Sequence, residues 1–210
     1  MSVLVGIELC GTEVVLTVVS RGAEILATVT EPLSEPMAAW WRCHPEERYR
    51  AVLSTLERAV GEGALRSDQV AGIGLSGETG LVLLDLEFKA IPPRSIPWEE
   101  LFGEECSRSP VPALRVLAEK KPRLANRIGL VMSPIDYIRF RLTGALATHV
   151  GFAWSTGLVE GPEAADSWNP EACMSLGLSP RAFPPIFHAT CRVGVVQEEV
   201  SKRTGLRTGL

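Results

Sequence analysis

The chain has 210 residues, with 21 basic and 25 acidic side chains and a formal net charge of −4. Nucleic acids and anionic membranes attract clustered Lys and Arg, so this balance disfavours both as partners. Hydrophobic residues make up 46% of the chain, which excludes a disordered protein and provides for a core. No apolar run approaches the roughly 20 residues of a membrane span, and the N-terminus lacks the basic region of a signal peptide.

The cysteines are odd in number and widely spaced, with no C-x-x-C pair; they are Cys10, Cys43, Cys106, Cys173 and Cys191. This pattern argues against a disulfide scaffold or a structural zinc site, and it indicates a reducing cytoplasm. Apart from Cys43, which lies between Arg42 and His44, the cysteines have no adjacent histidine, and we expect the thiols to be unreactive.

The first part of the chain predicts three antiparallel strands. Residues 3–9 and 13–19 are two β-branched runs joined by the short turn Cys10-Gly11-Thr12, which predicts a β-hairpin. Residues 24–30 predict the third strand, and Pro32 ends it.

A helix and a parallel strand are predicted next. Apolar residues at helical spacing follow Pro45 and predict a helix that Gly61 ends; they are Tyr49, Val52, Leu53, Leu56 and Val60. Residues 70–75 form a short apolar run after this helix, which predicts a buried parallel strand. Residues 76–80 then make a tight loop, and residues 81–84 return as another strand. This order predicts an α/β domain with a mixed sheet flanked by helices.

The second half of the chain has one strong helix signal. Residues 133–136, Ser-Pro-Ile-Asp, combine an N-cap serine, a proline in the first turn and an acid at the capping-box position, and Gly144 closes this helix. The proline-rich residues 92–112 predict a long functional loop. Short helices are predicted near residues 170–176 and 195–204.

The first candidate site is the predicted hairpin turn. Glu8 stands at a strand end just before Gly11 and Thr12. Its carboxylate would hold Mg²⁺ through water, while the glycine lets backbone N–H groups approach phosphate oxygens and the threonine adds a hydroxyl. The alternative is an ordinary hairpin turn whose Glu8 points to solvent.

The second candidate site would bind a polyol. Glu78 and Thr79 follow a predicted parallel strand, at whose carboxyl end the ligands of α/β sheets tend to bind. Trp98 and Glu100 place an aromatic ring near a carboxylate, which suits a sugar. The alternatives are a turn that needs its two glycines and a surface loop with one buried tryptophan. His149 has no partner at metal-ligand spacing and is expected to be structural or exposed.

Six segments, in order and over the full length, resemble motifs of the N-terminal domain of the FGGY carbohydrate kinases, most closely its xylulokinase branch. The best single match is residues 133–144, which resemble the family's P-x-D-Y-[IL]-x-x-x-L-T-G helix. The other motifs are G-I-D-x-G-T-[ST], W-x-x-x-[DN]-P-E, a strand with a G-Q-x-x-G loop, W-x-D-x-R and T-D-x-S-x-A-S. In that order, they resemble residues 6–12, Trp40 with 45–46, 71–85, 96–100 and 147–155.

The resemblance implies a ribonuclease H-like fold of the actin, hexokinase and sugar kinase superfamily. It implies that residues 1–210 are an N-terminal sugar-binding lobe, and that the C-terminal nucleotide-binding domain lies outside this chain. The family uses ATP and Mg²⁺, and its general base is an Asp of a G-G-x-D motif beyond these residues. We therefore expect a sugar or polyol ligand, no tight binding of ATP or Mg²⁺ and no kinase activity by this chain alone. The expected partner is a missing lobe or a second copy that forms a homodimer.

The positions expected to face a ligand differ from the family pattern, whereas the helix and strands that form the fold match it. Glu8 replaces the usual Asp, Cys10 shifts the Gly-Thr pair by one position, and Thr79 stands where xylulokinases carry a sugar-contacting His. Phe102 replaces the Arg of W-x-D-x-R, and His149 replaces the Asp of T-D-x-S. These departures motivate an alternative, a degenerate kinase-like domain that serves as a non-catalytic binding or regulatory module. An actin- or chaperone-like ATPase half fits the implied fold but not the P-x-D-Y helix.

Overall fold

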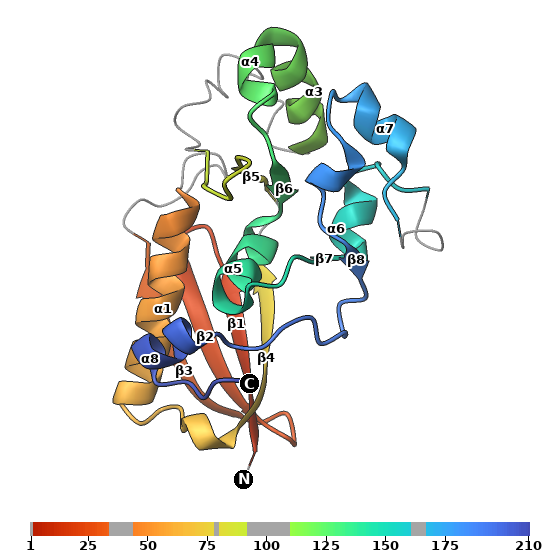
Figure 1. The fold of residues 1–210 in the computed structure, drawn as a ribbon. Coiled ribbons are helices and arrows are strands. Elements are labelled where there is room, and N and C mark those ends of the chain that lie inside the picture. The colour runs from red at the N-terminus through yellow and green to blue at the C-terminus, as the bar shows by residue number, and fades with distance from the viewer. Residues whose placement is uncertain (1, 34–43, 78–79, 92–109, 161–166) are drawn as a thin grey trace.

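A four-stranded mixed sheet forms one half of the computed structural model, which describes residues 2–33, 44–77, 80–91, 110–160 and 167–210 (Figure 1). The strand order is β3-β2-β1-β4. Strands β1, β2 and β3 pair antiparallel, whereas β4 pairs parallel to β1. The predicted hairpin, third strand and parallel pairing are therefore confirmed, with bounds β1 Val3–Leu9, β2 Glu13–Ser20, β3 Ile25–Pro32 and β4 Val70–Gly77. The predicted burial of the parallel strand is wrong, because β4 lies at the edge of the sheet and only its Val70 is buried.

Alternation of side chains gives this sheet one apolar face. In β1, Val3, Val5, Ile7 and Leu9 are buried, while Glu8 between them is exposed. Since successive residues of a strand point to opposite faces, the buried set forms one side of the sheet. In β2, the alternate residues Val14, Leu16 and Val18 are buried on that side.

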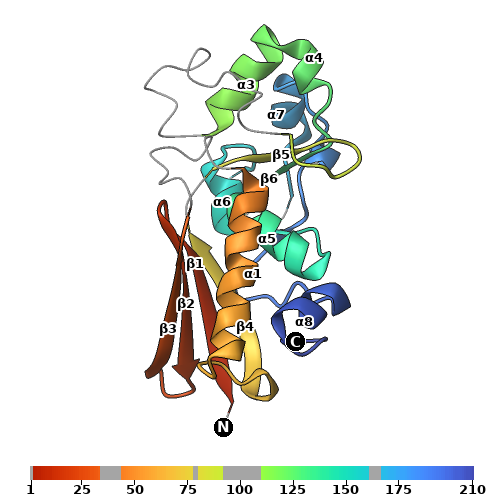
Figure 2. The same ribbon diagram turned by 90° about the vertical axis from the view of Figure 1, so that its left-hand side faces the viewer.

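Three helices cover the apolar face (Figure 2): α1 (Pro45–Gly61), α5 (Pro134–Thr143) and α8 (Glu198–Thr204). Helix α1 packs against β2 and β3, α5 against β4, and α8 against α1. Of the five apolar residues predicted for the inner stripe of α1, four are buried and Val60 is partly buried. Across the described ranges, no helix has the length and apolar character needed to span a membrane.

Local signals at the start and end of α5 behave as predicted. The Ser133 hydroxyl accepts a hydrogen bond from the Asp136 N–H, and the Asp136 carboxylate accepts one from the Ser133 N–H. Gly144 ends the helix at φ 74°, a left-handed conformation that glycine adopts without steric cost. The short helices predicted near the C-terminus are α7 (Pro170–Ser175) and α8, of which α8 begins only at Glu198.

A second apolar core lies beside the first. Strand β5 (Val82–Leu84) pairs antiparallel with β6 (Leu130–Met132) in a separate two-stranded sheet. The strand predicted at residues 81–84 thus exists, but it leaves the main sheet because the short buried run of β6 pairs with it. The pattern of residues 130–132 was too short to predict this strand.

Short elements complete the second core. Helix α6 contributes Phe152 to it and α7 contributes Cys173, while β7 pairs parallel to β8. Helices α3 and α4 lie at the end of the molecule far from both chain termini (Figure 1). The bounds are η1 Ser67–Gln69, α3 Pro110–Lys120, α4 Pro122–Ala125, β7 Thr148–His149, α6 Val150–Ser155, η4 Pro180–Ala182 and β8 Ile186–Phe187.

Candidate functional site

The carboxyl ends of the parallel strands β1 and β4 meet at one edge of the main sheet. Their register places Glu8 opposite Ser76 and Leu9 opposite Gly77. The hairpin turn that begins after Leu9 and the end of β4 at Gly77 therefore lie side by side. Such edges, where parallel strands end, are where the ligands of α/β sheets bind. We call this part of the molecule, Glu8–Thr12 with Ser76 and Gly77, the strand-end site.

Gly77 is required for the close approach of the two strands. Its φ is +148°, and a Cβ atom added there would lie 2.6 Å from the Leu9 carbonyl oxygen and 2.7 Å from the Leu9 Cβ. A contact that short forces neighbouring atoms to move, and here one of them is backbone. The position of β4 relative to the hairpin thus depends on the absence of a side chain at residue 77.

The hairpin turn is short and held by backbone hydrogen bonds. The Cys10 N–H donates to the Glu13 carbonyl at 2.9 Å, and the Leu33 N–H donates to the Thr12 carbonyl at 2.8 Å. The side chains of Glu8 and Thr12 are exposed, whereas Gly11 is half-buried. An exposed carboxylate beside a tight turn is consistent with both interpretations of this hairpin, a phosphate turn and an ordinary one.

Glu8 is the residue predicted to hold Mg²⁺. Within the described ranges, no three side chains of His, Cys, Asp or Glu gather closely enough to hold a metal ion by themselves. Magnesium usually keeps several waters and takes one or two carboxylates plus phosphate oxygens of its substrate. The exposed carboxylate of Glu8 at the strand-end site fits that mode of binding.

The predicted sugar-binding residues Glu78, Thr79, Trp98 and Glu100 lie outside the residues that the structure describes. Their predicted role therefore stays a prediction. Ser76 and Gly77, which directly precede Glu78, do lie at the strand-end site.

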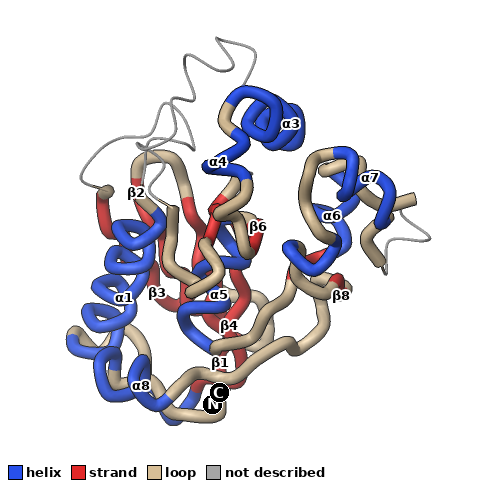
Figure 3. Tube along the Cα trace, turned by 45° about the horizontal axis from the view of Figure 1, so that its top comes forward, coloured by secondary structure: helices blue, strands red, loops and turns tan. Residues whose placement is uncertain are grey.

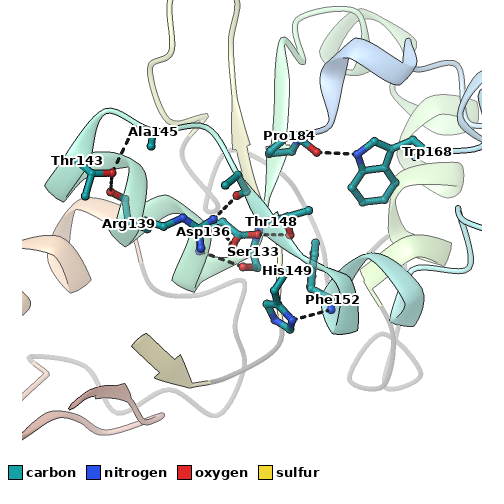
Figure 4. Close-up of polar contacts among 11 residues, drawn as sticks. Ser133, Asp136, Arg139, Thr143, Ala145, Thr148, His149, Phe152, Trp168 and Pro184 are labelled. Carbon is teal, nitrogen blue, oxygen red and sulfur yellow. Dashed lines mark hydrogen bonds and ion pairs between the residues drawn. The ribbon is translucent and has the colours of Figure 1, made fainter. Parts of the chain in front are cut away.

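The best-matching motif proves to hold the two cores together (Figure 4). Asp136 is fully buried, and its carboxylate accepts hydrogen bonds from the Ser133 N–H, the Thr148 hydroxyl at 2.6 Å and the Arg139 guanidinium at 2.7 Å. Arg139 also donates to the Ala147 carbonyl. Because Thr148 belongs to β7 and Asp136 to α5, this network links the helix of the first core to the strand pair beside the second.

His149, which replaces the Asp of the T-D-x-S motif, caps a helix. Its Nδ1 accepts a hydrogen bond from the Phe152 N–H at 3.2 Å, at the start of α6 (Figure 4). His44 does the same for α1, where its Nδ1 accepts from the Glu46 N–H. The expectation that His149 is structural is thus confirmed. Neither cap was predicted, because histidine is not among the residues that usually cap helices.

Replacing His149 with alanine should lower the free energy of unfolding by about 1 kcal/mol, the usual cost of a lost N-cap. His149→Asp should retain the stability, since aspartate is a preferred cap and favours the positive end of the helix dipole. Urea denaturation measures both. His188→Ala, at an exposed histidine, is the control, with a change within about 0.5 kcal/mol. Equal losses in the Ala and Asp variants would contradict the capping role.

The same α5 motif also contacts a second motif segment, residues 45–46, at the start of α1. The Tyr137 hydroxyl donates to the Glu46 carboxylate, 91 residues away in the sequence, and Arg141 contacts the same carboxylate. The Arg141 guanidinium lies over the Tyr49 ring, 4.1 Å from its centroid, which is a cation–π contact. Burial and the hydrogen bond to Glu46 raise the pKa of Tyr137 well above its ordinary value. The resembling residues 45–46 and 137–141 therefore serve packing between α1 and α5.

Similarity to known proteins identifies the family of this domain. The sequence profile of the N-terminal domain of the FGGY family of carbohydrate kinases matches residues 105–210, just over half of the chain. The chain belongs to the FGGY family of carbohydrate kinases. The predicted membership in this family is thereby confirmed.

FGGY relatives match over nearly all of these residues. The chain is 26% identical to the xylulose kinase of Bacillus subtilis, over 98% of this chain and 46% of the relative. It is also 26% identical to the xylulose kinase of Escherichia coli, over 97% of this chain and 46% of the relative. The chain thus spans about half the length of these FGGY proteins.

Solved structures confirm the fold. The structure of a xylulose kinase from Rhodospirillum rubrum superimposes with a TM-score of 0.79 at 21% identity, covering 99% of this chain and 48% of that one. A gluconate kinase from Lactobacillus acidophilus gives a TM-score of 0.79 at 18% identity, with 99% and 46% covered. The predicted ribonuclease H-like fold of the sugar kinases is therefore confirmed for this FGGY domain.

Proposed function

We propose that this chain is the N-terminal, sugar-binding lobe of an ATP-dependent carbohydrate kinase that phosphorylates a ketose or polyol similar to xylulose. The observation that carries this proposal is the register of β1 and β4, which brings Glu8 and the hairpin turn beside the end of β4 at Ser76 and Gly77. In an FGGY domain, that edge would bring a phosphate-binding turn next to a sugar-binding loop. The lobe comprises residues 1–210, and a second lobe would bind the nucleotide.

In this proposal, each predicted residue binds the metal, the phosphate or the sugar. Glu8 holds Mg²⁺ through water, while the Gly11 backbone and the Thr12 hydroxyl face the phosphate. Glu78 and Thr79 hydrogen-bond sugar hydroxyls, and Trp98 with Glu100 completes the sugar site. Transfer of the phosphoryl group from ATP then depends mainly on positioning and on charge stabilisation by Mg²⁺. The base that takes the hydroxyl proton belongs to the second lobe, so this chain alone is inactive.

A binding and activity assay on the 210-residue chain tests the proposal. Calorimetry with xylulose should show saturable binding, and Thr79→Val should weaken it about tenfold. Thr28→Val, on the exposed side of β3, is the matched control and should leave the affinity unchanged. A coupled ADP assay with Mg²⁺-ATP and xylulose should show no turnover. Turnover would contradict the inactivity of the lobe, and failure of every pentulose and polyol to bind would contradict its sugar-binding role.

A second candidate function rests on the departures at Glu8, Cys10, Thr79 and His149. A degenerate kinase-like domain would keep the fold and act as a binding or regulatory module. In that case the variant Glu8→Asp, which restores the usual residue, would not improve binding of Mg²⁺ or phosphate. In the kinase lobe, it would improve both.

We further propose that the strand-end face is covered in the functional protein, either by the second lobe or by another copy of this chain. A homodimer would show a concentration-dependent mass in size-exclusion chromatography with light scattering. A constant monomer mass would favour the second lobe. Small-molecule partners and widely spaced thiols suit a cytoplasmic protein, and we propose that location.

A further inference from the structure

A pocket of about 280 Å³ opens between α1, α5 and α8. Residues in or next to all three helices line it. Figure 3 shows these helices on the same side of the main sheet. None of the residues assigned above to phosphate, metal or sugar lines it. Its polar lining consists mainly of five side chains from the three helices and of Gln197, which precedes α8: Glu46, Arg50, Arg141, Gln197, Glu199 and Arg203.

Arg141 is held in a fixed position in the pocket lining. Its guanidinium lies on the Tyr49 ring, and its Nη1 donates to the Tyr137 hydroxyl at 2.7 Å and to the Glu46 carboxylate. Both of those hydrogen bonds use Nη1, so within the described part of the chain Nε and Nη2 remain available to a ligand. About a third of the side chain (31%) is exposed. A pre-oriented donor of this kind loses little conformational entropy when it binds.

The charges of the pocket nearly cancel. Arg141 is paired with Glu46, and the Arg203 Nε donates to Glu57 at 2.6 Å. Arg50 and Glu199 are exposed on α1 and α8, and neither has an ion-pair partner among the residues that the structure describes. One unpaired cation and one unpaired anion give no excess of either sign. Such a lining does not favour a simple anion or a simple cation.

The chemistry that matches this lining is that of hydroxyl groups. Guanidinium, carboxylate and carboxamide groups are planar, and each presents polar atoms side by side. A hydroxyl both donates and accepts, so neighbouring hydroxyls on one ligand satisfy guanidinium donors and carboxylate acceptors at the same time. The volume lies just below the range of about 300–1,000 Å³ typical of drug-sized ligands, which suits a smaller molecule.

We infer that the pocket between α1, α5 and α8 binds a neutral polyhydroxylated molecule of pentose size, such as a pentitol. This site is separate from the strand-end site and does not depend on the function proposed for it. The three helices belong to one apolar core, so an occupant that bridges them stabilises their packing. Ligands that bind only the folded state raise its stability.

Titration of the 210-residue chain with xylitol, followed by ¹H–¹⁵N NMR, tests the inference. Saturable shifts are expected at the amides of Gly144, Gln197 and Glu199, together with a rise in Tm. Inorganic phosphate and glycine serve as the anionic and zwitterionic probes, and neither should saturate these shifts. Binding of either one without binding of xylitol would overturn the proposed ligand class.

Variants separate the pocket from the strand-end site. The double variant Arg50→Gln with Glu199→Gln changes two exposed side chains and should weaken xylitol binding at least tenfold with the fold intact. Glu198→Gln with Lys202→Gln, an exposed ion pair outside the pocket lining, makes the same kinds of change and should leave the affinity unchanged. Shifts confined to Glu8 and Ser76 would overturn the pocket site while supporting the proposed sugar lobe. An unchanged affinity in the double variant would also overturn it.

Discussion

Replacing Gly77 with alanine should lower the free energy of unfolding by about 2–4 kcal/mol. The new Cβ would lie 2.6 Å from the Leu9 carbonyl oxygen, so either β4 or the end of β1 has to move. The residue would also adopt a φ of +148°, and such sparsely populated conformations cost on the order of 1–3 kcal/mol. Chemical denaturation in urea, with the midpoint and slope fitted together, measures the loss.

Gly74→Ala is the matched control, because it adds the same methyl group to the same strand. No atom lies within 4 Å of the Cβ that would be added there. We expect a change of less than about 1 kcal/mol, of either sign, since alanine in a compatible conformation also restricts the unfolded chain. If Gly77→Ala lowered the free energy of unfolding no more than Gly74→Ala does, then β4 would not approach Leu9 this closely in the folded protein.

Replacing Asp136 with asparagine should lower the free energy of unfolding by about 3–5 kcal/mol, the usual cost of breaking a buried ion pair. The Asp136 side chain is fully buried and the Arg139 side chain is only 15% exposed. Loss of the negative charge would leave the guanidinium in a largely buried site without its counter-charge. Since domains are stable by only about 5–15 kcal/mol, this loss should bring the midpoint of thermal unfolding down by many degrees.

Two further variants isolate the cause in Asp136→Asn. Thr148→Val removes one hydrogen bond to the same carboxylate and should cost about 1 kcal/mol. Asp68→Asn breaks an exposed ion pair with Arg66 and should change the stability by less than about 1 kcal/mol. Similar losses for Asp136→Asn and Asp68→Asn would show that the buried network contributes little.

The predicted elements that were confirmed depend on local signals. The hairpin was predicted because its two runs are short, β-branched and separated by a turn of three residues. Helix α5 was predicted from its capping box and from Gly144, and the structure contains both features. Each signal involves groups only a few residues apart, so the chain order alone makes the contact available.

The missed elements depend on distant partners. Strand β6 has only three residues, and its pairing with β5 joins residues 46–50 positions apart in the sequence. The caps formed by His44 and His149 were missed because histidine rarely plays this part, although both histidines directly precede helices. The Glu46–Tyr137 hydrogen bond spans 91 residues, and no local pattern indicates it.

The candidate site was likewise predicted in part from the sequence and decided in part by the tertiary structure. Its residue types and their place at strand ends followed from the sequence, and the family resemblance covered the whole chain. Only the tertiary structure decided that Glu8 lies opposite Ser76 and that Leu9 leaves no room for a side chain at Gly77. Local sequence determines which elements form, because their hydrogen bonds and turns are short-range. Which elements then meet depends on burial over the whole chain, which is why the register and the pocket between α1, α5 and α8 appear only in the folded domain.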